Sequence, residues 1–236
     1  MTADQATFLP DDTEPGYAGH RERLRKRFID GGADALPDYE LLELALFGPI
    51  LRKDTKPLAK KLIAQFGDFA GVISASPAQL AAQGLNENVI ATLKVIQAGA
   101  LRLSRQRVMT QPILSSWTAL TEYLHSAMAR ETNEQFRLLF LDRKNRLIHD
   151  EVQQRGTVDH TPVYVREVVK RALELSATAL ILVHNHPGGD ATPSRADIEM
   201  TRDIARALTP VGVTVHDHVI VGGGEPASLR AMGLLS

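Results

Sequence analysis

Two periodicities divide the chain into a helical first part and a second part in which strands and helices alternate. Between residues 20 and 102, apolar positions recur at helical spacing in segments separated by glycine and proline. From residue 136 onward, short apolar runs alternate with amphipathic helical segments. This pattern predicts an α/β domain with a mixed sheet between helices, preceded by a small all-α domain.

The predicted elements begin at capping residues and end at glycines or prolines. In the first part we expect helices over residues 20–30, 38–47, 56–66 and 88–102, with a short helix from Ser76. In the second part a helix starts after Ser116, and the other expected helices cover 162–175 and 194–208. Strands are expected over 136–141, 147–154, 179–184 and 213–221.

Composition shifts mark four regions along the chain. Residues 1–16 are polar and acidic and are expected to form a flexible tail. Residues 17–104 form the helical domain, residues 105–115 are a polar linker with one proline, and residues 116–236 form the α/β domain.

Composition also excludes several classes of protein. The net charge of −1 over 236 residues gives no general attraction to nucleic acid, so such binding needs a local patch. The absence of cysteine excludes disulfides, thiolate zinc sites and a cysteine nucleophile. No apolar run reaches the ~20 residues of a membrane span, and the start of the chain does not resemble a signal peptide. We therefore expect a soluble cytoplasmic protein with no membrane partner.

The most informative stretch joins a buried strand to the start of a helix. Residues 180–183 are all apolar, and His184 and His186 follow two apart, so they project to the same side at the strand end. A proline and two glycines then turn the chain. Ser194 is a natural N-cap, with Asp197 three residues later. The turn can bring Asp197 back to face the two imidazoles.

This arrangement predicts a metal site. The pair Ser194 and Asp197 could be only a capping box, and a lone histidine beside a strand is usually a core residue. Burying two imidazoles and a carboxylate without partners would cost roughly 1–3 kcal/mol for each group, and a metal removes that cost. We expect one zinc ion per chain, held by His184, His186 and Asp197, with a fourth position left for water.

These residues resemble a known motif. The pattern His-x-His, ten residues, Asp, with Ser three before the Asp, resembles the JAMM motif of MPN-domain metalloproteases. The wording over residues 184–197, His-Asn-His-Pro-x-Gly-Asp-x-x-Pro-Ser-x-x-Asp, is similar to the bacterial RadC family. The resemblance is close over 112–225 and weaker over 17–105. Gly188, where that family usually has serine, lies outside the ligand set. Further agreeing segments are 136–142, 155–159, 166–169 and 217–222.

The resemblance implies an MPN fold and a catalytic glutamate. JAMM enzymes place a non-ligand glutamate just before or at the start of an early strand, where it acts as general base. Glu134 fits this position best, and Glu131 and Glu151 are alternatives. Ser194 would donate a hydrogen bond to the oxyanion of the tetrahedral intermediate. Asn185 points away from the ligands and is assigned no chemistry.

The helical domain looks like a helix-hairpin-helix unit, which RadC-like proteins carry at the N-terminus. Such hairpins bind DNA phosphate through backbone N–H groups at a helix start. Here the turn at residues 84–86 has Asn86 in place of the second glycine, and its side chain can block the phosphate. The basic run over residues 21–27 fits a solvated face as well as a phosphate-binding one. Weak DNA binding and docking to a protein both remain open.

A second histidine pair, His216 and His218, lies on one face of the last strand. No acid follows it at a helix start, so we expect a structural role for His218, hydrogen-bonded near the site. The remaining histidines lack ligand-like spacing: His20, His125, His149 and His160.

The leading hypothesis is a zinc metallopeptidase of JAMM type, which cleaves a peptide or isopeptide bond in a peptide or protein substrate. The alternative is a DNA-associated accessory protein of the RadC type, in which the metal domain mainly binds a partner. A zinc deaminase of the familiar type needs a Cys-x-x-Cys pair, which this chain lacks. A nuclease usually gathers more carboxylates around its metals. Both therefore rank low.

Overall fold

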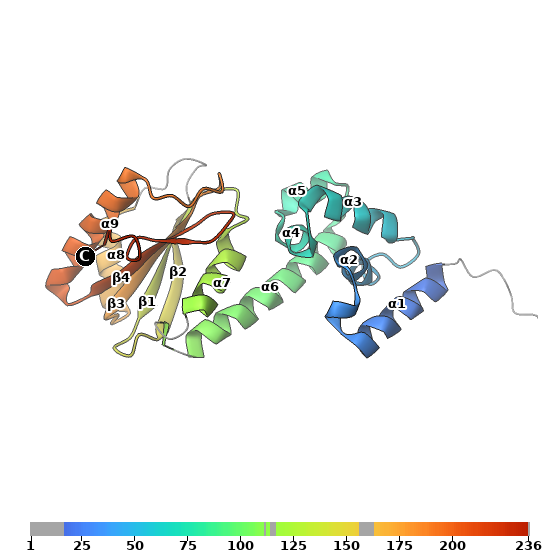
Figure 1. Ribbon diagram of the computed structural model, residues 1–236, viewed down its shortest axis with the longest axis horizontal. Coiled ribbons are helices and arrows are strands. Elements are labelled where there is room, and N and C mark those ends of the chain that lie inside the picture. Colours follow the sequence, from blue (N-terminus) through green and yellow to red (C-terminus); the bar gives the residue numbers. More distant parts are fainter. Residues whose placement is uncertain (1–16, 111, 114–116, 156–162, 236) are drawn as a thin grey trace, which may run out of the picture. The chain divides into compact units, whose positions relative to one another are not determined.

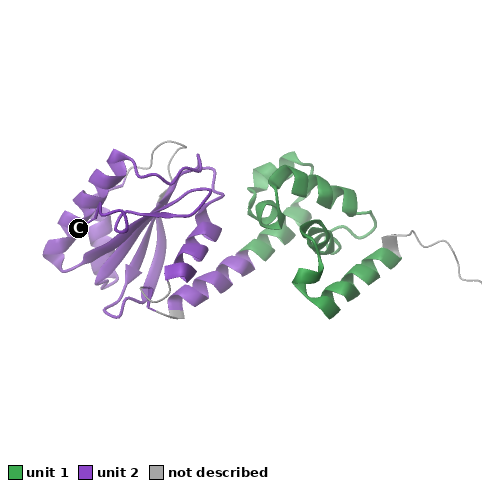
Figure 2. Ribbon diagram, viewed as in Figure 1, with its two compact units in different colours: residues 1–97 green, residues 98–236 purple. Residues whose placement is uncertain are grey.

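The computed structural model describes residues 17–110, 112–113, 117–155 and 163–235 (Figure 1). The chain forms two compact units, residues 1–97 and residues 98–236 (Figure 2). The expected tail over residues 1–16 lies outside the described residues. Within the described parts, no helix is both long and apolar enough to cross a membrane.

The first unit is helical. Its core consists of apolar side chains at helical spacing, among them Leu42, Leu46, Leu62 and Leu80. The helices are α1 (Tyr17–Gly31), α2 (Asp38–Leu46), α3 (Lys56–Phe66), α4 (Phe69–Ser74), α5 (Pro77–Ala82) and α6 (Glu87–Thr110), with a 3-10 turn at Ala33–Ala35. The pattern did not predict α4, which is only six residues long and is too short for a helical period to stand out.

One residue of the basic run has a structural role in this unit. Arg21 is buried, and its guanidinium donates to the carbonyl oxygens of Ile50 at 2.7 Å, Leu51 at 2.9 Å and Lys53 at 2.7 Å. It also stacks over the ring of Phe47, with 4.7 Å from Cζ to the ring centroid. Arg21 thus fixes the loop that follows α2 and is not available to a phosphate.

We expect Arg21→Met to lower the free energy of unfolding by about 2–3 kcal/mol, because the carbonyl groups of Phe47, Ile50, Leu51 and Lys53 lose a charged donor. Arg23→Met is the matched control, since Arg23 is exposed on the same helix and should change stability by less than about 0.5 kcal/mol. Urea denaturation followed by circular dichroism measures both. Equal stability of the two variants would contradict the role given to Arg21.

Helix α6 is longer than the sequence pattern suggested. It continues through residues 105–110, which were expected to begin the linker over 105–115. Val108 explains the extension, because it is buried with Leu120 and Leu124 in a core of the second unit. The compact units accordingly divide between Gln97 and Ala98, before the expected boundary at residue 104.

In its described residues, the second unit is a five-stranded mixed sheet with helices on both faces, which confirms the predicted α/β class. The strand order is β2-β1-β3-β4-β5, with β3 and β4 parallel and the other neighbours antiparallel. Helices α8 and α9 pack on one face, and α7 packs on the other (Figure 1). The strands are β1 (Gln135–Leu141), β2 (Leu147–Arg155), β3 (Ala179–Asn185), β4 (Thr214–Val221) and β5 (Ala227–Ser228). The helices are α7 (Trp117–Met128), α8 (Val165–Glu174) and α9 (Arg195–Leu208), followed by a 3-10 turn at Thr209–Val211.

The central strand β3 is buried along its whole length, as its apolar run predicted. Leu180 and Leu182 belong to the core under α8 and α9, whereas Ile181 and Val183 belong to the core under α7. Side chains alternate along a strand, so His184 projects to the α9 face. Asn185 projects to the α7 face.

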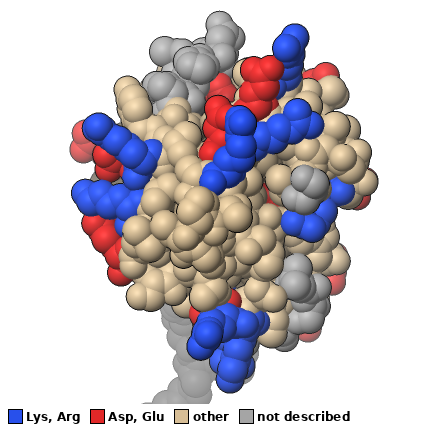
Figure 3. All heavy atoms as spheres, turned by 90° about the vertical axis from the view of Figure 1, so that its left-hand side faces the viewer, with Lys and Arg blue, Asp and Glu red and all other residues tan. Residues whose placement is uncertain are grey.

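Surface charges in the second unit are mixed in sign. On the face shown in Figure 3, lysine and arginine side chains lie beside acidic ones around an uncharged central area. Helix α9 carries the ion pair Arg195–Glu199 at 2.9 Å, and α8 carries Arg171–Glu174 at 3.0 Å. The described residues on this face therefore offer no extended basic surface to a nucleic acid.

Candidate metal centre

Strand β3 and its continuation position the two histidines. His184 is the second-to-last residue of β3, and the backbone N–H of His186 donates to the Val221 carbonyl oxygen of β4 at 2.9 Å. The turn after His186 packs tightly on the end of β4, where a side chain at Gly222 would collide with the Gly189 carbonyl oxygen. Gly222 therefore permits the turn that carries the chain toward α9.

The start of α9 brings Asp197 to these histidines. Asp197 is buried, and its Oδ2 accepts from the backbone N–H of Ser194 at 2.7 Å and from the Ser194 hydroxyl at 2.6 Å. The Nε2 atom of His184 lies 3.2 Å from Asp197 Oδ1, and Nε2 of His186 lies 3.7 Å from Oδ2. The two Nε2 atoms are 2.9 Å apart. A tetrahedral zinc site with bonds of ~2.0–2.1 Å has edges of about 3.3 Å, so these separations fit one ion.

A chain of hydrogen bonds fixes the tautomer of His184. The Thr201 hydroxyl has one hydrogen and donates it to the Asp197 carbonyl oxygen at 2.6 Å, so it accepts from Nδ1 of His218, also at 2.6 Å. Nε2 of His218 then accepts from Nδ1 of His184 at 2.7 Å. This leaves the lone pair of His184 on Nε2, the atom that faces Asp197.

A hydrogen bond also fixes the tautomer of His186. Its Nδ1 donates to the Asp190 carbonyl oxygen at 2.6 Å, which leaves the lone pair on Nε2. Burial lowers the pKa of His184 to about 4, with a further lowering by His186 and an opposing effect of Asp197. Burial, and then the two neighbouring histidines, also lower the pKa of His218 well below its usual range. Two neutral imidazole lone pairs and a carboxylate therefore converge, and this set suits a metal ion.

We expect Thr201→Val to weaken metal binding by about 10–100-fold, because the valine cannot accept from Nδ1 of His218 and the tautomer of His184 is no longer fixed. Thr201→Ser, which keeps the hydroxyl, should bind metal as the parent does. Competition with a chromophoric chelator measures both affinities. Equal affinity of the valine and serine variants would show that the chain of hydrogen bonds does not orient the ligand.

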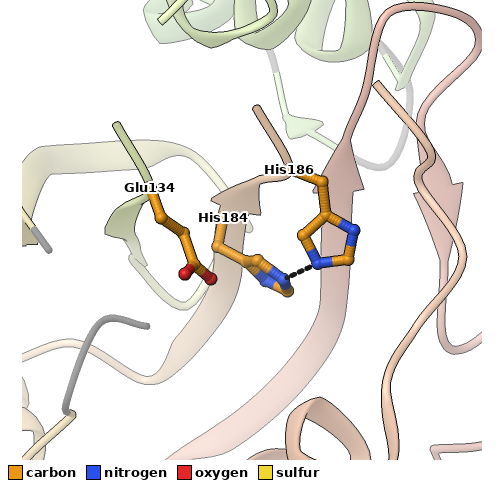
Figure 4. A group of neighbouring side chains, drawn as sticks. All are labelled: Glu134, His184 and His186. Atoms are coloured by element: carbon orange, nitrogen blue, oxygen red, sulfur yellow. Dashed lines mark hydrogen bonds between the residues drawn. The ribbon is translucent and has the colours of Figure 1, made fainter. Parts of the chain in front are cut away.

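Glu134 lies beside the two imidazoles. A carboxylate oxygen of Glu134 and a ring nitrogen of each histidine, His184 and His186, lie within 4.8 Å of one another. Figure 4 shows the carboxylate directed toward His184, with His186 on the other side of that ring. Two overlapping sets thus share the imidazoles, one completed by Asp197 and the other by Glu134. Asp197 Oδ1 lies 3.2 Å from Nε2 of His184, and Asp197 is the carboxylate ligand expected from sequence.

The other two glutamates considered from sequence have different surroundings. Glu151 is on β2, where its carboxylate accepts from Arg171 at 2.7 Å and lies 3.3 Å from Nε2 of His149. Glu131 lines a cavity of about 270 Å³ with Tyr123 and Arg137. Of the three glutamates, only Glu134 is grouped with His184 and His186 among the described residues.

His218 has the structural role expected from sequence, whereas Thr201 was not predicted. His218 is fully buried between His184 and Thr201, and neighbouring Asp217 faces away and accepts from Ser228 and Arg230. The spacing of Thr201 could have indicated this role, because a residue four positions after Asp197 lies on the same face of a helix.

Comparison with known proteins agrees with the geometry. The family model described as a RadC-like JAB domain matches residues 114–234. A UPF0758 protein of Rhodobacter capsulatus is 59% identical over 213 residues, which make up 90% of this chain and 100% of that protein. The match covers the strands and helices that carry His184, His186 and Asp197. The chain therefore belongs to the RadC family of proteins with a RadC-like JAB domain.

Proposed function

We propose that the protein is a zinc-dependent hydrolase of JAMM type, a metallopeptidase or isopeptidase. The observation that carries the proposal is the convergence of two imidazole lone pairs and the Asp197 carboxylate, with the Glu134 carboxylate beside them. A carboxylate that can act as a base beside an open metal site is typical of metal-assisted hydrolysis.

In this proposal His184, His186 and Asp197 hold the zinc ion. Three protein ligands leave a fourth position for water or substrate, whereas a structural zinc site is closed by four protein ligands. Bound zinc acts as a Lewis acid and makes hydroxide available from water near neutral pH. Hydrogen bonds keep the three ligand side chains in the orientation described above: His184 donates to His218, His186 donates to the Asp190 carbonyl oxygen, and Asp197 accepts from Ser194.

Glu134 is the proposed general base. It would accept a proton from the attacking water and deliver it to the amine that leaves. The partly buried Glu134 lies beside His184 and His186, whereas Glu151 is held by Arg171 and Glu131 lines a cavity with Tyr123 and Arg137. These positions support Glu134 over the two alternatives.

Ser194 is proposed to assist the reaction as an oxyanion donor. Its hydroxyl donates to Asp197 Oδ2 at 2.6 Å and accepts from the backbone N–H of Asp197 at 3.1 Å. To serve an oxyanion, the hydroxyl must exchange its carboxylate partner for the substrate oxygen. Whether the hydroxyl donates to Asp197 or to the substrate oxygen, the capping box would keep Ser194 next to Asp197.

Screening a peptide and isopeptide library with the zinc-loaded full chain tests this proposal. We expect cleavage products that disappear after chelation and return when zinc is added back. A zinc-loaded protein that cleaves no peptide or isopeptide bond, while the metal site is fully occupied, would contradict the proposal.

The alternative function, a DNA-associated accessory protein, has less support. The side-chain oxygen of Asn86 accepts from the backbone N–H of Val89 at 3.0 Å, so this donor at the start of α6 already has a partner. Arg21 is bound to carbonyl groups, and Arg27 is paired with Glu40. The cations left exposed on α1, with no acidic partner described above, are Arg23, Arg25 and Lys26, which are few contacts for a phosphate backbone.

A further inference from the structure

Asn185 stands between the two histidines in sequence and points to the other face of the sheet. It is 1% exposed, which is rare for an asparagine unless all of its polar atoms are bonded. Its side chain points away from those of His184 and His186, and the alternation of side chains along the strand predicted no chemical role for it.

Its amide group bonds to the segment that precedes and begins β1. The side-chain oxygen accepts from the backbone N–H of Gln135 at 2.9 Å. The side-chain nitrogen donates to the carbonyl oxygens of Asn133 at 3.2 Å and Glu131 at 3.5 Å. All three backbone groups lie within residues 131–135, on both sides of Glu134.

The pairing of the strands explains why a side chain is needed there. The register of β1 with β3 begins at Phe136 opposite His184, so Gln135 and the residues before it lie beyond the paired stretch. The backbone of β3 does not pair with these residues. The side-chain amide of Asn185 therefore provides the acceptor for Gln135 and the donor for Asn133 and Glu131. An aspartate could accept from Gln135 but would present an oxygen to the two carbonyl groups, and an alanine would offer no polar atom.

We propose that Asn185 is a positioning residue, which holds the segment carrying Glu134 against the strand that carries His184 and His186. Three consecutive residues at the end of β3 then position the two imidazoles and set the distance from them to the Glu134 carboxylate. This inference rests on the proposed role of Glu134 as general base. A displacement of about 1 Å in such a group can slow a reaction on the order of 10²-fold.

The test compares Asn185→Ala with Asn185→Ser and with Thr178→Val. Asn185→Ser is the milder change, because a hydroxyl can still accept a hydrogen bond, and it decides the question if the alanine variant does not fold. Thr178→Val is the matched control, since the Thr178 hydroxyl donates to the Leu141 carbonyl oxygen at 3.4 Å, at the opposite end of the same strand pair. Crystal structures of the zinc-loaded variants, their zinc content and their turnover of a library-derived peptide are measured on the full chain.

We expect the Asn185 variants to bind one zinc ion as the parent does, while the Glu134 carboxylate moves away from His184. Turnover by Asn185→Ala should fall about 10²-fold in kcat with little change in KM, and Thr178→Val should match the parent. In the Glu134→Gln background, Asn185→Ala should slow the reaction no further, because it acts through Glu134.

Two results would overturn the proposal. The first is a Glu134 carboxylate that stays in place in the folded Asn185 variants. The second is a double variant whose rate falls below that of Glu134→Gln by the full factor that Asn185→Ala causes in the parent. Asn185 would then act independently of Glu134. If the parent cleaves no substrate, the proposed hydrolase function fails, and the crystal structures alone still decide whether Asn185 positions Glu134.

Discussion

Replacing Glu134 with glutamine is expected to leave zinc bound and to slow hydrolysis by about 10²–10⁴-fold, the usual scale of general-base catalysis. Glutamine has nearly the same shape but cannot accept a proton. The Glu134 carboxylate lies beside His184 and His186, so the change removes the proposed base at the proposed metal site without removing a proposed ligand. Initial rates on a library-derived peptide and zinc content by elemental analysis measure the two effects separately.

Glu131→Gln and Glu151→Gln are the matched controls, because the sequence alone also allows either of these glutamates to be the general base. Both variants should keep activity, since neither glutamate is grouped with the two histidines in the described residues and Glu151 is held by Arg171. Full activity of Glu134→Gln together with loss in one of the other two would mean that a different glutamate is the base. If none of the three matters, this mechanism does not operate.

His186→Ala is expected to lose most of the bound zinc. The variant removes one of the two converging lone pairs and leaves only His184 and Asp197 of the three proposed ligands. His186 is the better choice for the experiment because it is less buried than His184 and does not bond to His218, so the fold should tolerate its removal.

His216→Ala is the control for this variant. His216 is partly buried on β4, and its Nε2 is bonded to the Asn145 side-chain oxygen at 2.7 Å, away from the proposed ligands. It should retain one zinc ion per chain. Equal zinc in His186→Ala and the parent, measured after dialysis at matched concentration, would rule out His186 as a ligand.

The proximity of His184, His186 and Asp197 could be predicted from sequence because short-range geometry determines it. His184 and His186 are two residues apart on a strand, so they share a side. Ser194 and Asp197 are three apart at a helix start, so they form the capping box observed here. One turn joins these two pieces, and no long-range pairing was needed to bring them together.

The surroundings of the ligands could not be predicted in the same way. The choice among Glu134, Glu131 and Glu151 depends on how β1 pairs with β2 and β3, and that register is not visible in local patterns. The bonds from Asn185 to residues 131–135 join positions about 50 apart in the chain. A polar residue in a strand gives no sign of its partner until the sheet is assembled.

The helical part shows the same limit. The signals for α3 and α5 were local, with a proline in the first turn of each and a serine cap on α5, and both helices occur where expected. The end of α6 depends on tertiary contact, because Val108 is buried among residues of the second unit. The polar stretch over residues 105–115, which contains one proline, was therefore predicted to be a linker, although residues 105–110 are helical.

Anomalous diffraction from crystals of the zinc-loaded full chain, recorded on both sides of the zinc absorption edge, tests the central claim most directly. We expect one peak per chain, about 2.0–2.2 Å from Nε2 of His184, Nε2 of His186 and a carboxylate oxygen of Asp197, with Glu134 outside bonding distance. A peak bonded to Glu134 in place of Asp197, or no peak between the two imidazoles at full zinc loading, would contradict the proposed site.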